Sequence, residues 1–178
     1  MKSNPVRTPS LVWRPAVLLL VLLVGPPPAR ALQGDEQQPM YIEADDVEVR
    51  ESESVSIYVG NVQVDQGTIR LRADHVTVHH REDRRPKFMI ALGQPATYRQ
   101  QLDGDEGEVE AMARRMEFDV EADLLTLIDE AVLIQGRDRL ASDRIQYDRN
   151  RAHFRAGGSG RVRITITPEP QPQTAPRP

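Results

Sequence analysis

The chain has 178 residues, no cysteine and a formal net charge of −4. The lack of cysteine excludes disulfide bonds and thiolate metal sites, and four scattered histidines are a poor basis for a zinc enzyme. Residues 1–31 hold four basic side chains and no acid, so the charge without them changes from −4 to −8, which speaks against nucleic acid as a partner. Composition and charge therefore predict neither a metal site nor a nucleic-acid partner.

Residues 1–31 have the pattern of a secretory signal peptide. Basic residues precede an apolar run over 16–24, and the small-x-small site Ala29-Arg30-Ala31 follows a Gly-Pro-rich stretch. As a helix, this apolar run rises about 14 Å, roughly half of a ~30 Å hydrocarbon core. We therefore expect cleavage after the site and export of the mature chain. An uncleaved inner-membrane anchor that retains residues 11–31 is the alternative.

Between two polar segments, residues 39–167 have the pattern of a β-sheet domain. The segments are a leader over 32–38, expected to be flexible, and a proline-rich tail over 168–178, expected to be disordered. The domain alternates apolar and polar residues with period two and is rich in Val and Ile. About sixteen short strands are predicted from this pattern. They cover 40–43, 47–51, 54–59, 62–65, 68–72, 75–80, 87–92, 96–101, 108–111, 115–120, 124–128, 131–135, 138–141, 144–148, 151–156 and 161–166.

One phrase recurs within these strands. Ala44-Asp45-x-Val47-x-Val49 returns as Ala73-Asp74-x-Val76-x-Val78, then in looser form over 113–118 and 142–147, at intervals of 29, 40 and 29 residues. The larger unit thus repeats every 69 residues, and a fixed period indicates stacked structural units. Many short strands without helices imply a sheet that closes or folds over on itself. The sequence predicts a layered, all-β, antiparallel fold with an internal 69-residue duplication, either a β-barrel or a β-jellyroll that is open or poorly closed at its two ends.

The alternation also predicts which side chains face inward, except near Gly60-Asn61. There, Tyr58 joins Val62 and Val64 on one face if no bulge intervenes, whereas a bulge would put Val59 and Val62 on the same side. We expect an inner set of Val62, Val64, Ile69, Leu71, Val76 and Val78, matched across the repeat by Ala131, Leu133, Leu140, Ile145 and Tyr147.

Four segments, in the right order, resemble the periplasmic lipopolysaccharide-transport bridge proteins of the LptA/OstA family. They are Gln38-Pro39-Met40-x-Ile42-Glu43-Ala44-Asp45, Val59-Gly60-Asn61-Val62-x-Val64-x-Gln66-Gly67-x-Ile69-x-Leu71-x-Ala73-Asp74, Gly93-Gln94-Pro95-Ala96-Thr97-Tyr98 and Ser142-Asp143-x-Ile145-x-Tyr147. The resemblance covers residues 38–167. It departs in the second repeat, where Asp129-Glu130 replaces a Gly-Asn pair and leaves the turn geometry open.

The resemblance implies a sixteen-strand β-jellyroll with a V-shaped section and an apolar groove. Such proteins reside in the periplasm and stack end to end, head to tail, by strand pairing. They join an inner-membrane jellyroll subunit of the export complex to the N-terminal jellyroll domain of the outer-membrane translocon. Lipopolysaccharide is expected to slide along with its acyl chains in the groove, without catalysis or a cofactor. A jellyroll sugar-processing enzyme is the competing class, but the sequence shows neither convergent carboxylates nor cleft aromatics.

The binding residues are predicted to be aliphatic or aromatic. An acidic protein attracts a phosphorylated glycolipid by burying acyl chains, at ~0.8 kcal/mol per CH₂ group. The pattern alone fits a closed core equally well, and the resemblance favours an accessible groove. The predicted lipid-binding residues are Met40, Ile42, Val62, Val64, Ile69, Leu71, Val76, Val78, Phe88, Ile90, Tyr98, Met116, Phe118, Leu125 and Leu127.

Partner docking is predicted at the strand edges that the two ends of the stack leave unpaired. At the C-terminal end Val162, Ile164 and Ile166 form an uninterrupted apolar row, and residues 40–43 are the candidate at the other end. The basic cluster over 81–87 is either a rim that contacts phosphates or an ordinary charged hairpin tip.

Overall fold

The computed structural model of the protein describes residues 34–35, 37–102, 107–151 and 153–168. The predicted signal peptide (1–31) and residues 169–178 of the predicted tail lie outside the described residues. Within the described part, no helix is long and apolar enough to cross a membrane.

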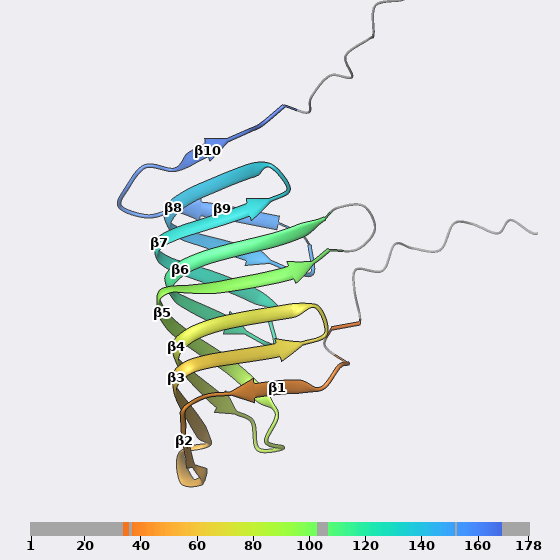
Figure 1. Cartoon of the computed structure of the whole chain (residues 1–178), viewed down its shortest axis with the longest axis vertical. Helices are drawn as coiled ribbons and strands as arrows, with labels where there is room; N and C mark the ends of the chain where they lie inside the picture. The colour runs from red at the N-terminus through yellow and green to blue at the C-terminus, as the bar shows by residue number, and fades with distance from the viewer. Residues whose placement is uncertain (1–33, 36, 103–106, 152, 169–178) are drawn as a thin grey trace, which may run out of the picture.

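Ten antiparallel strands form one sheet, in which the long strands follow one another in chain order (Figure 1). The order is β1-β3-β4-β5-β6-β7-β8-β10, with β2 also paired to β3 and β9 also paired to β8. The predicted all-β, antiparallel class is confirmed, and the described residues add only the short 3-10 helix η1 (Glu51–Glu53). The strands are β1 (Met40–Glu43), β2 (Asp46–Arg50), β3 (Val55–Gln66), β4 (Ile69–His80), β5 (Pro86–Gln101), β6 (Glu108–Asp119), β7 (Leu124–Gln135), β8 (Asp138–Asp148), β9 (His153–Gly157) and β10 (Arg163–Thr165).

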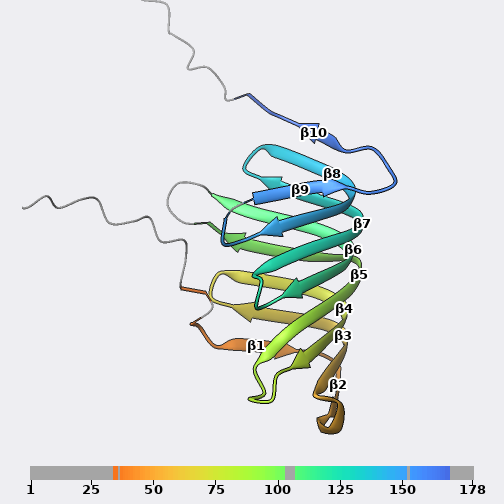
Figure 2. The ribbon, with the colours of Figure 1, turned by 180° about the vertical axis from the view of Figure 1, so that it is seen from behind.

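A line of register shifts crosses the long strands β3 to β8 near their middles. The sheet folds along this line, so the two halves of each long strand lie in two facing layers (Figures 1 and 2). The layers are joined at this fold line, and the hairpin turns lie along the opposite, open side (Figure 1). The front layer contains 40–43, 62–66, 69–73, 96–101, 108–113, 131–135, 138–142 and 163–165. The back layer contains 46–50, 55–59, 75–80, 86–92, 115–119, 124–128, 144–148 and 153–157.

The strand count corrects the prediction of about sixteen short strands. The predicted strands 54–59 and 62–65, for example, are the two halves of the continuous strand β3. The turn-forming residues between such halves mark bulges, where the strand bends while the ladder resumes on either side. A Gly-Asn or Ala-Asp pair in a sequence does not distinguish a bulge from a chain reversal. The internal duplication itself stays a prediction.

The bulge of β3 keeps the inward parity of Tyr58, Val62 and Val64. Gly60 and Asn61 both adopt a left-handed backbone conformation between the two halves of the strand. Val62 is 1% exposed and Tyr58 packs against the core, whereas Val59 is 43% exposed. The expectation that a bulge would put Val59 and Val62 on the same side is therefore wrong, because two left-handed residues are inserted and the alternation resumes in phase.

The space between the layers is filled by small and branched apolar side chains. The inner set predicted from period two is confirmed, with Leu71 and Leu140 only partly buried at its margin. The fully buried members come from both halves of the chain, such as Val62, Val76, Leu127 and Ile145. Residues i and i+2 of a strand share a face, and each long strand runs through both layers. Each long strand therefore contributes inward side chains to both layers.

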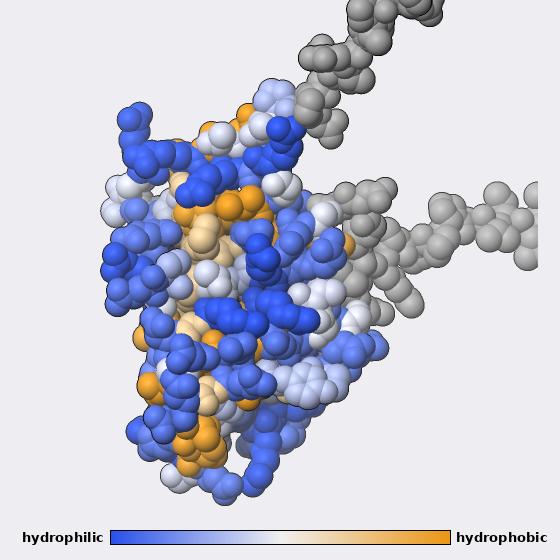
Figure 3. Space-filling model, viewed as in Figure 1, coloured by the Kyte–Doolittle hydropathy of each residue, from blue (hydrophilic) through white to orange (hydrophobic). Residues whose placement is uncertain are grey.

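The outer surface contrasts with this interior. The face seen in Figure 3 is mostly hydrophilic, with a narrow strip of hydrophobic area that runs from one end of the sheet to the other. β2 exposes Val47 and Val49 at one end, and Ile164 and Ile166 are exposed at the other. Charged side chains of the long strands, such as those of Arg99 and Glu110, pair across neighbouring strands at 2.8 Å. The molecule thus keeps its exposed apolar residues mainly for its terminal strands.

Candidate functional site

An apolar cavity of about 50 Å³ lies between the two layers. The front layer contributes side chains of β1, β3, β4 and β5 to its wall, and the back layer those of β5, β6 and β7, with one from the turn after β8. The lining residues are Met40, Val64, Gln66, Ile69, Leu71, Met89, Ala91, Tyr98, Met116, Phe118, Leu125 and Arg149.

Cross-strand pairing brings these side chains together. Leu71 lies opposite Tyr98 in the front layer. In the back layer Phe118 lies between Met89 on one neighbouring strand and Leu125 on the other. Directly opposed residues have their Cβ atoms about 4.5–5.5 Å apart and so form continuous rows across a sheet. The cavity is therefore walled by two such rows that face each other.

The structure brings together many of the predicted lipid-binding residues. Those that line the cavity are Met40, Val64, Ile69, Leu71, Tyr98, Met116, Phe118 and Leu125. Val62, Val76, Val78 and Leu127 belong to the same buried core beyond the cavity wall, and Ile42 packs against it partly buried. A role for these residues in lipid binding stays a prediction, although their inward position is established.

Phe88 and Ile90 do not face the cavity, which corrects their predicted place. In β5 the buried residues are Met89 and Ala91, so Phe88 and Ile90 lie on the outer face. Phe88 contacts the His79 ring there, with centroids 6.3 Å apart. Residues 88–92 are apolar at both parities, so alternation could not choose between the two faces.

Sequence reasoning also missed Arg149 and Gln100, which belong to a polar network beside the cavity. Arg149 falls between the predicted strands 144–148 and 151–156, and Gln100 stands among polar neighbours. A signal was available in the inward alternation itself. Ala96 and Tyr98 lead to Gln100, just as Ile145 and Tyr147 lead to Arg149. Extending each alternation by two residues would have placed both side chains inside.

The polar network links the two layers on their open side. Arg149, in the turn after β8, forms an ion pair with Asp123 at 2.8 Å. Its Nε donates to Oε1 of Gln100 in the front layer at 3.3 Å, and the Tyr98 hydroxyl donates to the same oxygen at 2.7 Å. The Gln100 amide in turn donates to the Asp35 carboxylate at 3.1 Å. Burial raises the pKa of the Tyr98 phenol, against a smaller opposing effect of Arg149, so the hydroxyl stays a donor.

Asp35 fastens the chain before β1 to the turn between β3 and β4. Its buried carboxylate accepts hydrogen bonds from the Thr68 amide at 2.7 Å and the Thr68 hydroxyl at 2.8 Å. Asp35 lies in the segment 32–38, for which flexibility is predicted. Its hydrogen bonds with Thr68 hold this residue against the sheet. The flexibility of the whole leader stays a prediction.

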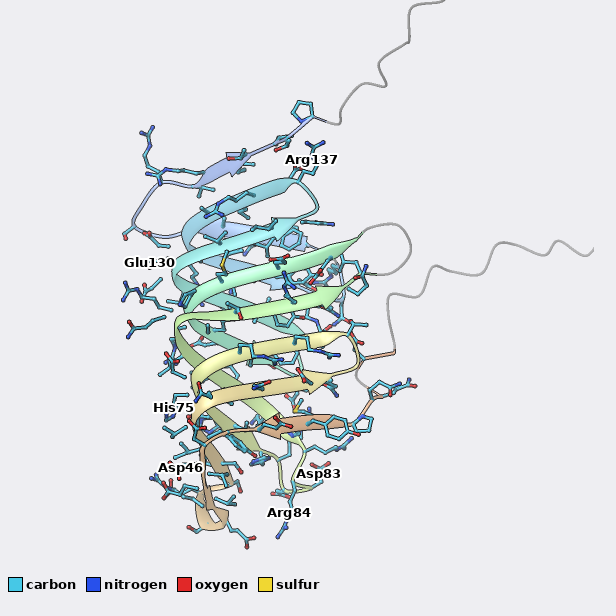
Figure 4. All side chains as sticks on the ribbon, viewed as in Figure 1. Asp46, His75, Asp83, Arg84, Glu130 and Arg137 are labelled. Atoms are coloured by element: carbon cyan, nitrogen blue, oxygen red, sulfur yellow. The ribbon has the colours of Figure 1, made fainter. Side chains whose placement is uncertain are left out.

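The basic cluster over 81–87 sits at a hairpin tip on the open side, where Figure 4 labels Asp83 and Arg84. Arg85 pairs with Asp83 at 2.6 Å, and Arg84 and Arg81 pair with Glu51 and Glu121 at 3.4 Å. These arginines already have acidic partners, which favours the reading as a charged hairpin tip. The described residues contain no group of three or more side chains that could hold a metal ion.

Comparison with known proteins identifies the family. Residues 41–153 match the family described as "LptA/(LptD N-terminal domain) LPS transport protein". The chain belongs to this family. The lipopolysaccharide export system protein LptA of Escherichia coli K12 is 36% identical over 132 residues, which are 74% of this chain and 71% of that protein. The export system protein LptH of Pseudomonas aeruginosa is 29% identical over 143 residues, covering 80% and 82% of the two chains.

A solved structure extends the comparison to the fold. The crystal structure of Pseudomonas aeruginosa LptH, described as the LptA-homologous periplasmic component of the lipopolysaccharide transport device, matches with a TM-score of 0.70 at 29% identity. The match covers 75% of this chain and 99% of that chain. The family resemblance carried by the four sequence segments is thereby confirmed.

Proposed function

We propose that this member of the lipopolysaccharide transport family is a periplasmic bridge protein that carries lipopolysaccharide from the inner to the outer membrane. The acyl chains lie between the two layers of the folded sheet. The observation that carries the proposal is the apolar cavity between two facing rows of side chains, in a chain whose relatives export lipopolysaccharide. Burial of acyl chains at ~0.8 kcal/mol per CH₂ group supplies the attraction.

Lipid entry requires the layers to separate along their open side. The apolar side chains of the two layers are largely buried against one another around this cavity, so they leave little room for a lipid with several acyl chains. The layers are joined by continuous strands at the fold line, whereas at the open side short hairpin turns face one another. Widening the section from that side exposes the apolar rows without breaking the β-ladders.

The buried carboxylates support a role in transport rather than catalysis. Asp35 accepts hydrogen bonds from Thr68 and Gln100, and Asp123 is ion-paired with Arg149. Both groups are thus engaged by donors of the protein itself, whereas a glycosidase needs two carboxyl groups that face a substrate. We therefore propose no enzymatic activity.

The proposed assembly is end to end, through the terminal strands. β1 and β2 each pair with β3 only, and β9 and β10 each pair with β8 only, within the described residues. Unpaired backbone groups along such edges favour addition of a strand from another chain. The proposed partners are a second copy of the chain, an inner-membrane jellyroll subunit and the N-terminal jellyroll domain of the outer-membrane translocon.

Charge substitutions on the inner and outer faces of the back layer test whether lipid binds between the layers. Met89→Glu and Phe118→Glu put an uncompensated charge against acyl chains, so we expect lipopolysaccharide binding to weaken by at least about tenfold. Ile90→Glu, on the outer face, is the matched control and should bind as the wild type does. Native mass spectrometry of folded variants isolated from the periplasm measures bound lipid.

The same measurement tests the competing cases. Normal lipid occupancy in the Met89 and Phe118 variants would remove the cavity as the binding site. The mass of the isolated protein distinguishes cleavage after Ala31 from an anchored subunit that retains residues 11–31.

A further inference from the structure

Arg149 occupies an unusual place in the wall of an apolar cavity. Among the described residues that line the cavity it alone carries a charge, and its side chain is 7% exposed. The guanidinium lies 5.2 Å from the centroid of the Phe118 ring, in the geometry of a cation–π contact. A buried cation is costly unless it is paired, and Asp123 supplies the pair.

The guanidinium contacts Asp123 and Gln100, and separation of the layers affects these two contacts differently. Asp123 and Arg149 extend the ladder of β7 and β8, and the Arg149 amide also donates to the Asp123 carbonyl at 3.1 Å. Both residues therefore stay together in the back layer. Gln100 belongs to the front layer, so opening of the groove breaks its hydrogen bond with Nε of Arg149.

Breaking this bond leaves a donor of a charged group without its acceptor. A hydrogen bond to a charged group is stronger than one between neutral groups, so a replacement acceptor is favoured once the layers separate. Asp123 holds Nη1, and the side of the guanidinium that carries Nε is the one turned toward Gln100. Guanidinium forks bind the paired oxygens of a phosphate bidentately, which an uncharged amide cannot match.

We infer that Arg149 binds a phosphate group of the lipid headgroup at the mouth of the open groove, in place of Gln100. The inference rests on the proposed function, because it needs acyl chains between the layers to bring the headgroup to this place. Gln100 closes the empty groove by holding Arg149, and the phosphate holds the same side of the guanidinium when lipid is bound. An acidic chain thereby gains a local attraction for a phosphorylated glycolipid that its net charge does not provide.

The test compares binding of bisphosphorylated lipid A and of the same lipid after dephosphorylation to the mature protein. We expect the wild type to prefer the phosphorylated lipid by about tenfold. Arg149→Gln combined with Asp123→Asn removes both members of the buried ion pair, so neither charge is left alone. This double variant should bind both lipids equally. Arg99→Gln, at an exposed arginine paired with Glu110, is the control and should keep the preference.

Asp123→Asn alone provides a readout that a structural role of the pair would not give. It removes the carboxylate whose negative charge offsets the charge of Arg149 and repels phosphate, so the preference for phosphorylated lipid should increase. A double variant that retains the full preference would overturn the inference while the proposed function stands. A wild type that binds neither lipid would instead overturn the proposed function. Inorganic phosphate alone is titrated to millimolar concentration while the NMR resonances of the Arg149 side chain are followed. Saturable shifts of these resonances would reassign the site to free phosphate.

Discussion

Asn61 and Glu130, which are 69 positions apart, adopt the same left-handed backbone conformation at the bulges of β3 and β7, with φ of 46° and 55°. Each follows a second left-handed residue, Gly60 in one bulge and Asp129 in the other, with φ of 79° and 60°. Gly and Asn adopt positive φ readily, whereas Glu does so rarely. Figure 4 places Glu130 at the fold line, where it pairs with Arg114 at 2.7 Å. The bend of the sheet therefore imposes this backbone geometry on residues that do not favour it.

The first prediction concerns this strained pair. Asp129→Gly should raise the free energy of unfolding by roughly 0.5–1 kcal/mol, because glycine adopts φ near 60° without the cost that a Cβ brings. Urea-induced unfolding measures the change. Asp129→Ala is the control, because alanine keeps the Cβ and should not stabilise the protein. A fall in stability for the glycine variant would show that the Asp129 side chain matters more than its backbone conformation.

The second prediction separates backbone strain from steric overlap at two glycines. Gly60 and Gly136 both have positive φ, 79° and 57°, so alanine at either position costs on the order of 1 kcal/mol. At Gly60 an added Cβ would also overlap the Asp45 carboxylate, whereas at Gly136 it meets nothing within 4 Å. Gly60→Ala should therefore destabilise the protein clearly more than Gly136→Ala in thermal unfolding. Equal losses would mean that Asp45 moves aside at little cost.

The sequence was sufficient for the strand class because period two continues through nearly the whole domain. It also placed Val62, Val76 and Ile145 inside correctly, since each alternates with polar neighbours. It could not separate bulges from turns, because the same residue types serve both. For that reason the continuous strand β3 was predicted as two strands.

The candidate site was less accessible to sequence reasoning. Phe88 and Ile90 were placed inward because both faces of that segment are apolar, and only the register with β4 and β6 selects Met89 and Ala91. Arg149 and Gln100 come from distant strands, so their contact across the open side depends on how the layers face each other. Alternation predicts the direction of a side chain but not the residue that meets it from the other layer.

The C-terminal edge has the features of a docking strand. β10 is three residues long, pairs with β8 alone within the described residues, and places Ile164 opposite Leu140. Ile164 is 66% exposed, and Val162 and Ile166 are exposed as well. No inward charge or proline blunts this edge before Pro168, unlike the edges that proteins usually protect. Removing β10 from the sheet would leave the cavity wall intact, because none of its residues lines the cavity.

The last prediction is that Ile164→Pro abolishes the proposed end-to-end assembly while leaving the fold and the proposed lipid binding intact. Proline removes a backbone donor and disfavours a regular strand, so a second chain can no longer continue the ladder. Sedimentation velocity over a range of concentrations measures self-assembly, and a pull-down measures capture of the N-terminal jellyroll domain of the translocon. Ile164→Thr keeps the backbone donor and the β-branched shape, and should still assemble if main-chain pairing is decisive. Concentration-dependent oligomers of the proline variant that still capture the partner would exclude β10 as the docking edge.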